Sequence, residues 1–346
     1  MVLNNRLSSL SRRFGAVGIW GVLFCLASVS NAYAAGPGPD ACKGCHEDAV
    51  ASYTKSIHGQ KGHANSPASA GDCSSCHGDG TAHVKANGGK GVGGIKGFNN
   101  KAISAKDKSE TCLACHTTTE SLTFWDSGKH KRNDVSCNDC HSVHTPTSAG
   151  NPKMLKVKSP SVGPITTTTR TLDHEVCNSC HRDKRGEILK PSHHPVVEGK
   201  VKCADCHNPH GTMSKAMLKG ETVNDLCLTC HTDKRGPFIH EHAPVEENCL
   251  ICHNPHGSQH NRLLTEKAPR LCGNCHANGH THGLYDARST LPTISGLPGL
   301  PAGTTLVPGA NVVTGTTVRF EASGCINCHR QIHGSNAPGR GAQFVR

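Results

Sequence analysis

A single pentapeptide pattern, Cys-x-x-Cys-His, dominates this chain. It occurs ten times after residue 34 and accounts for every one of the 21 cysteines except Cys25. This pattern is the attachment sequence of c-type haem, in which two thiols one helical turn apart bond the porphyrin and the adjacent histidine binds the iron. Zinc ribbons and disulfide frameworks also pair cysteines, but neither requires a histidine after each second cysteine. The pattern therefore predicts ten covalently bound haem c groups.

The motifs define the attachment sites and one iron ligand for each haem, numbered here haem 1 to haem 10 in chain order. The cysteines expected to form thioether bonds are Cys42, Cys45, Cys73, Cys76, Cys112, Cys115, Cys137, Cys140, Cys177, Cys180, Cys203, Cys206, Cys227, Cys230, Cys249, Cys252, Cys272, Cys275, Cys325 and Cys328. The expected proximal iron ligands are His46, His77, His116, His141, His181, His207, His231, His253, His276 and His329.

The N-terminus predicts export from the cytoplasm. Three arginines precede an apolar stretch at residues 14–26, and Ala32-Tyr33-Ala34 follows as a small-residue cleavage site. This is the anatomy of a secretory signal peptide, so we assign residues 1–34 to it and favour the general secretory route over the twin-arginine route. Cys25 is expected to leave with this segment.

The charge of the chain does not indicate nucleic-acid binding. The formal net charge is +11, and three of those charges belong to the signal peptide. Each ferric haem with two ionised propionates contributes roughly −1, so ten haems nearly cancel the remaining excess. The basic residues are therefore interpreted as partners of propionates.

The second axial ligand decides whether a haem iron passes electrons or binds a substrate. Sixteen histidines lie outside the motifs, and every interval between motifs, as well as the C-terminal tail, contains at least one. All ten haems can therefore be bis-His, which predicts low reduction potentials, whereas the mature chain has only three methionines. Four regions offer one candidate, and they are His83, His130, His210 and His333. The other six offer two each: His58 or His63, His144 or His174, His193 or His194, His240 or His242, His256 or His260, and His280 or His282.

Two-haem repeats narrow this choice and predict the architecture. CNSCHRDKRG, HHPVV and CADCHNPHG in 177–211 reappear as CLTCHTDKRG, HEHAPV and CLICHNPHG in 227–257, which favours His194, His242 and His256. Five such units predict a linear haem array within one cytochrome domain, 35–346, with pentahaem halves 35–200 and 201–346 as a possible division.

Composition predicts how little regular structure this domain contains. Aromatic residues make up only 3%, so the haems must supply the core. With 38 Gly and 19 Pro, we expect an elongated multihaem cytochrome c, mostly irregular, with short α-helices and little or no β-structure. Loops are expected at 88–100, 145–171 and 291–317.

Several runs resemble one known family. CADCHNPHG, CLTCHTDKRGPF, EHAPVEENCLICHNPHGS, APRLCGNCH and CINCHRQIHGSN are similar to the periplasmic decahaem cytochromes of the MtrA, MtoA and DmsE type. The resemblance implies an elongated wire of bis-His haems. The distal ligands carried over by motif context are His58, His83, His130, His144, His194, His210, His242, His256, His280 and His333.

The resemblance also implies partners and a location. It implies a periplasmic protein held in an outer-membrane β-barrel porin, exchanging electrons with periplasmic or inner-membrane-anchored cytochromes, and facing an extracellular multihaem cytochrome or extracellular iron. The leading hypothesis is thus an electron conduit rather than an enzyme, with its direction open between iron oxidation and reduction of metal or a dimethyl-sulfoxide-type acceptor. The alternative is a multihaem reductase or oxidase of a small nitrogen or sulfur compound, which needs one open haem.

Overall fold

The helices of this chain are short because each is built around an attachment motif or a turn. In the computed structural model, residues 36–147, 151–156, 173–276, 325–327 and 329–337 are described. The predicted signal peptide and the predicted 291–317 loop lie outside these residues, as does most of 145–171. Within the described residues the α-helices are α1 Pro39–Lys43, α2 Glu47–Thr54, α3 Pro67–Ala70, α4 Ser74–His77, α5 Thr81–Lys85, α6 Ala105–His116, α7 Lys129–Arg132, α8 Cys137–Cys140, α9 Asp173–Asn178, α10 Arg182–Glu187, α11 Cys203–Cys206, α12 Val223–Leu228, α13 Ala243–Glu247 and α14 Ala268–Gly273.

Short 3₁₀ turns fill many of the remaining connections. They are η1 Ile57–Gly59, η2 Val92–Gly94, η3 Glu120–Leu122, η4 Thr232–Lys234, η5 Cys249–Ile251, η6 Asn261–Leu263 and η8 Cys325–Asn327. The described residues contain isolated β-bridges but no strand. The prediction of a mostly irregular fold with short helices is therefore confirmed.

Side-chain caps fix where several of these helices begin. The Ser104 hydroxyl accepts a hydrogen bond from the Asp107 N–H at 3.0 Å, which starts α6, the longest described helix. Thr222 and Asp225 form a reciprocal capping box at the start of α12. Such caps satisfy N–H groups that a short helix leaves without an internal partner.

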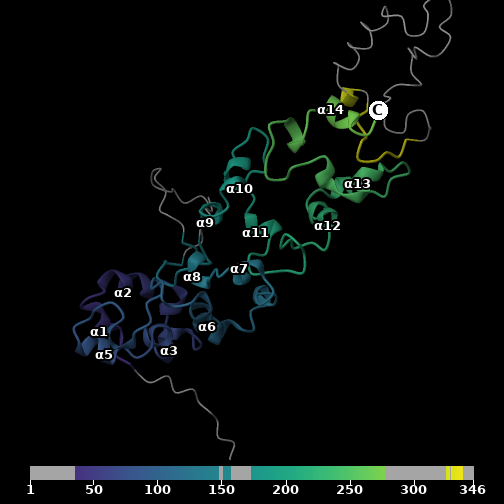
Figure 1. The fold of residues 1–346 in the computed structure, drawn as a ribbon. Coiled ribbons are helices and arrows are strands. Elements are labelled where there is room, and N and C mark those ends of the chain that lie inside the picture. The colour runs from purple at the N-terminus through teal and green to yellow at the C-terminus, as the bar shows by residue number, and fades with distance from the viewer. Residues whose placement is uncertain (1–35, 148–150, 157–172, 277–324, 328, 338–346) are drawn as a thin grey trace, which may run out of the picture.

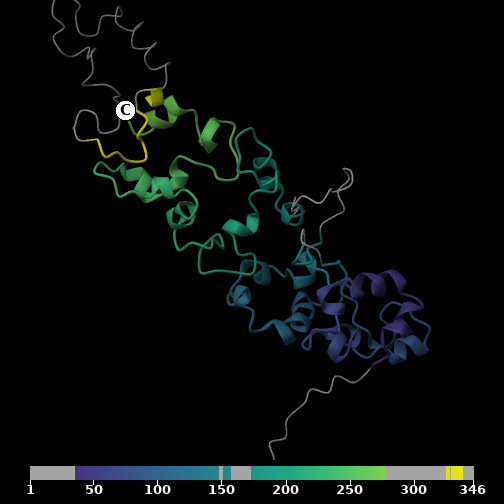
Figure 2. The same ribbon diagram turned by 180° about the vertical axis from the view of Figure 1, so that it is seen from behind.

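The described part of the molecule is elongated, and the chain progresses broadly from one end to the other, with local reversals such as the return of α5 to α1 (Figure 1). Helices α1, α2 and α5 lie at one end and α14 at the other, and the view from behind shows the same progression (Figure 2). The apolar core is sparse, since the buried hydrophobic residues of the described chain are Tyr53, Trp125, Ile188, Val196 and Ala268. Side chains alone therefore supply little of the apolar burial that stabilises a domain of this size.

Candidate haem-binding sites

Each attachment motif forms one turn of helix. In nine motifs the backbone N–H of the histidine donates to the carbonyl of the first cysteine, at 2.9–3.0 Å, and the remaining motif closes the helix α6. This helical turn places the two thiols on the same side of the backbone, and the histidine follows at the end of the turn. The described cysteines are not joined in disulfides. The local geometry is thus the one that thioether attachment requires, and Cys328 alone of the expected attachment cysteines lies outside the described residues.

A return loop after the even-numbered motifs holds the proximal histidine. His141, His207 and His253 each form an isolated antiparallel bridge with a leucine further along the chain. The Nδ1 atoms of these histidines hydrogen-bond to the carbonyls of Lys153, Ala216 and Arg262 at 2.7–2.9 Å. A carbonyl only accepts, so Nδ1 carries the proton and Nε2 keeps the lone pair that can bind iron.

Proximal and distal histidines face each other across gaps of nearly constant width. Within the described residues, nine imidazole pairs have ring centroids 6.1–6.4 Å apart. In the order of haems 1 to 9, the pairs are His46–His83, His77–His144, His116–His58, His141–His210, His181–His130, His207–His256, His231–His194, His253–His333 and His276–His242.

This separation fits an iron between the two rings. An imidazole nitrogen binds a first-row metal at about 2 Å and lies about 1 Å from its ring centre, so two ligands on opposite sides of one iron have centroids about 6 Å apart. The donor set of this chain therefore fits the haems that its motifs imply. The proximal partner of haem 10, His329, is described, whereas His280 and His282 lie outside the described residues.

The pairs follow a rule that crosses the two-haem units. The histidine shortly after an even motif faces the even haem of the preceding unit, as His210 faces His141 and His256 faces His207. The histidine between the two motifs of a unit faces the odd haem of the following unit, as His130 faces His181. Each internal unit thus gives one distal histidine to each of its two neighbours and takes one from each, as the second unit does with His130 and His144 against His58 and His210.

Hydrogen bonds between the exchanged segments reinforce this arrangement. His130 Nδ1 bonds to the Pro209 carbonyl at 2.7 Å, immediately before His210. In the next repeat, His194 Nδ1 bonds to the Pro255 carbonyl at 2.7 Å, immediately before His256. The segment that supplies one distal histidine therefore also orients the other.

The remaining histidines occupy other environments. Both ring nitrogens of His193 are used, by the Lys190 carbonyl and by Glu198, and these bonds raise its pKa. His240 Nε2 bonds to the Ala337 carbonyl at 3.0 Å. None of His63, His174, His193, His240 and His260 stands in the ring pairs of the described residues.

Burial favours the iron-binding form of several paired histidines. It lowers the pKa of His210 to about 4, with the neighbouring His141 as the next cause. Burial also lowers the pKa of His58, His77 and His333. The neutral imidazole that burial favours is the form that coordinates a metal.

Contacts between cysteines order the attachment sites along the chain. Within units, the first cysteines of consecutive motifs lie close enough for one thiol of each pair to affect the pKa of the other: Cys42 with Cys73, Cys112 with Cys137, Cys177 with Cys203, Cys227 with Cys249, and Cys272 with Cys325. Between units, the second cysteines interact electrostatically: Cys76 with Cys115, Cys140 with Cys180, Cys206 with Cys230, and Cys252 with Cys275. Each motif therefore neighbours the next, which makes the array linear.

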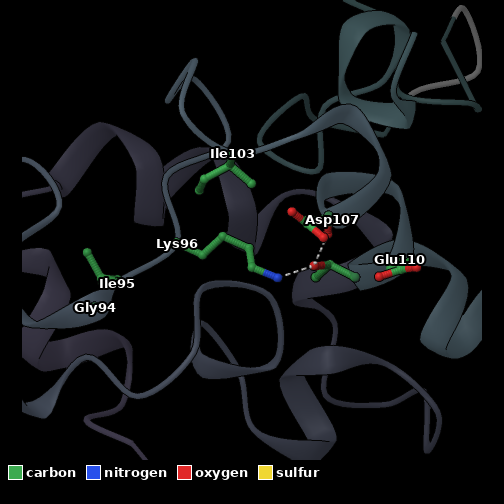
Figure 3. Close-up of a pocket in the computed structure, with 7 residues that line it drawn as sticks. Gly94, Ile95, Lys96, Ile103, Asp107 and Glu110 are labelled. Carbon is green, nitrogen blue, oxygen red and sulfur yellow. Dashed lines mark hydrogen bonds between the residues drawn. The ribbon is translucent and has the colours of Figure 1, made fainter. Parts of the chain in front are cut away.

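Lys96 connects the second and third attachment sites. Figure 3 shows its side chain extending towards the helix that carries Asp107 and Glu110. The backbone N–H of Lys96 donates to the His77 carbonyl at 2.9 Å, and its carbonyl accepts from His77 Nδ1 at 2.7 Å. Its ammonium group donates to the Thr111 hydroxyl at 2.7 Å, beside Cys112 on α6. Lys96 lies in the predicted loop 88–100, and loop composition alone gave no indication of this role.

Comparison with known proteins agrees with this geometry. The family model for a doubled CXXCH motif matches residues 193–236 and 242–281, and a model for NrfB-like c-type cytochromes matches residues 73–159. The chain is 34% identical to the multihaem cytochrome MtrA of Shewanella baltica strain OS185 over 304 residues, which cover 87% of this chain and 79% of that relative. The chain belongs to the MtrA family of multihaem cytochromes.

Membership in the MtrA family confirms the class of protein predicted from the motifs. This MtrA-family chain is a c-type cytochrome with several covalently bound haems, and it acts as an electron-transfer protein. The predicted multihaem fold and linear array are likewise confirmed.

Proposed function

We propose that this MtrA-family chain passes electrons through ten bis-His haem c groups between periplasmic carriers and the cell exterior, across the outer membrane. The observation that carries the proposal is the line of nine imidazole pairs in the described residues. Haem, when bound, supplies the one-electron chemistry. The chain contributes two axial nitrogens per iron and the order of the attachment sites.

The length of such an array suits a membrane crossing. Macrocycles in or near van der Waals contact lie about 10 Å apart, so ten in a row extend on the order of 90 Å. A compact globule of this chain length would be only about 50 Å across. A bilayer with its headgroups is roughly 40–45 Å thick. A linear array can therefore cross the membrane and still reach carriers on the periplasmic side.

A crossing of this kind requires a partner. No helix of the described residues is long and apolar enough to span a membrane. We propose that an outer-membrane β-barrel porin surrounds the array, that periplasmic or inner-membrane-anchored cytochromes exchange electrons at one end, and that an extracellular multihaem cytochrome or extracellular iron does so at the other. The relative reduction potentials of the partners at the two ends, and not the order of the haems, set the direction of electron flow.

Reconstitution in liposomes tests the conduit. Holoprotein assembled with its porin should let external dithionite reduce an internal redox dye, and external ferric iron oxidise it again. The matched control is the same holoprotein added to liposomes without the porin, which should leave the dye unchanged. Absence of transfer in the assembled complex, or equal transfer without the porin, would refute the proposal.

The spin state separates this conduit from an open-site enzyme. Ten bis-His irons predict that the oxidised holoprotein is low-spin throughout and binds cyanide or nitrite slowly. A high-spin fraction near one haem in ten at neutral pH would instead support the reductase or oxidase alternative.

A further inference from the structure

The even haems of three successive units differ in what faces their distal histidine. His144 Nδ1 bonds to the Ala49 carbonyl at 2.9 Å. His210 Nδ1 is buried and has no hydrogen-bond partner among the described residues. His256 Nδ1 lies 3.3 Å from the Glu187 carboxylate oxygen Oε2. Beside the three Nδ1 atoms there are thus a hydrogen-bonded carbonyl, no partner and a carboxylate charge.

The structure places the Glu187 carboxylate firmly at this site. Glu187 ends α10, and its side chain is only 21% exposed. Its Oε1 atom pairs with Lys184 at 2.9 Å, whereas its Oε2 atom is buried without an aligned hydrogen bond. A second acidic residue on the same helix, Asp183, is exposed and pairs with the same lysine at 3.4 Å.

The sequence does not repeat this carboxylate in the next unit. Glu187 follows CHRDKRG, and in the next repeat Pro237 follows CHTDKRG at the same position. The close approach of the two segments also depends on Gly257, because a Cβ atom there would lie 2.0 Å from the Glu187 carbonyl oxygen. Glycine at this position therefore lets His256 come within reach of the carboxylate.

A carboxylate at this distance affects the electronic character of an axial ligand. When Nε2 of a neutral histidine binds iron, Nδ1 carries the proton and points that N–H outward. The negative charge 3.3 Å from Nδ1 attracts the positive end of this N–H, which makes the imidazole a stronger donor to the metal even without an aligned hydrogen bond. A stronger donor favours the ferric over the ferrous state, so the reduction potential falls.

We propose that Glu187 is a positioning residue that lowers the reduction potential of haem 6, attached at Cys203 and Cys206, below those of haems 2 and 4. This proposal rests on the assignment of His256 as the distal ligand of haem 6. It introduces a step in potential at the middle of the array, and the side chain that creates the step makes no contact with the iron.

The test is the Glu187→Gln holoprotein, which keeps the shape of the side chain and removes its charge. In a spectroelectrochemical titration, about one tenth of the haem absorbance should shift to higher potential while the remainder titrates as in the parent protein. Asp183→Asn is the matched control, since it removes the same charge near the same haem without facing the ring, and its shift should be clearly smaller. Equal shifts in the two variants, or none in Glu187→Gln, would overturn the proposal.

Two further variants keep the outcome interpretable. Lys184→Met removes the cation that partly neutralises the Glu187 carboxylate, so the haem 6 component should move to lower potential. A move to higher potential would count against the proposal, even if the Glu187→Gln protein failed to mature. His256→Ala tests the ligand assignment separately, because it should make one haem high-spin. A low-spin His256→Ala protein would refute the assignment, whereas an unshifted Glu187→Gln protein with all haems low-spin would refute only the role of Glu187.

Discussion

Replacement of His210 by Met should alter haem 4 and leave haem 6 unchanged, although His210 stands only three residues after the last residue of the haem 6 motif. The reason is the 6.1 Å ring pair that His210 makes with His141. His/Met ligation raises the potential relative to bis-His ligation, and axial ligands as a whole span about 0.8 V, so a rise on the order of 0.2 V is expected.

The structure also limits how far this change spreads. A ligand that changed the charge by one unit about 10 Å from a neighbouring haem would alter the energy of that haem by about 1.7 kcal/mol at an effective dielectric constant of about 20. Histidine and methionine are both neutral ligands, so this substitution introduces no such charge. Haems 3 and 5 should therefore keep their potentials. In a potentiometric titration, one component of about one tenth of the absorbance should separate from the rest.

Removal of single motifs identifies the haem that has changed. In the His210→Met protein, replacing Cys137 and Cys140 by Ala removes haem 4 and should abolish the component with the shifted potential. Replacing Cys203 and Cys206 by Ala removes haem 6, and the shifted component should remain. His256→Met serves as the matched variant with the opposite dependence. If the shifted component of His210→Met depends on Cys203 and Cys206, the exchange of ligands between units is refuted.

Three other predictions concern the cofactors and the fold. The intact mass of the mature protein should exceed that of the polypeptide by ten haems that survive denaturation, and a smaller increase would mean that a motif is not used. Protein made without the haem-attachment machinery should be unfolded by circular dichroism, because the described chain buries few apolar side chains; a cooperative compact form would contradict this. Gly211→Ala should cost about 1–3 kcal/mol in thermal unfolding, since Gly211 has φ +125° and its Cβ would lie 2.3 Å from the Phe124 carbonyl. Gly186→Ala, with nothing within 4 Å of its Cβ, is the control and should be neutral or stabilising.

The attachment sites could be predicted from sequence because their chemistry is local. Cys-x-x-Cys-His places both thiols and one ligand within a single helical turn, so no tertiary information is needed. The distal residues were harder, yet the structure places every described member of the predicted set, such as His58 and His194, opposite a proximal histidine. Repeat positions and ring pairs agree here because equivalent segments meet equivalent neighbours; the ligation itself stays a prediction.

Which distal histidine faces which proximal histidine could not be predicted from the sequence. His58 lies closest in sequence to haems 1 and 2, but in the structure it faces His116 of haem 3. This choice depends on how whole units dock, which no local pattern encodes. The contact of Glu187 with His256 is equally non-local, and neither His144 nor His210 makes one like it, so repetition gave no indication of it.

The exchange of distal histidines has a consequence for how such chains change length in evolution. An inserted copy of a complete internal unit would receive its missing ligands from the units on either side and would return the same number. A deletion or insertion of one haem would instead leave one iron without a ligand and one histidine without an iron. Viable arrays of this design should therefore grow and shrink by duplication or loss of whole pairs, while the two terminal units, which exchange ligands on one side only, follow separate constraints.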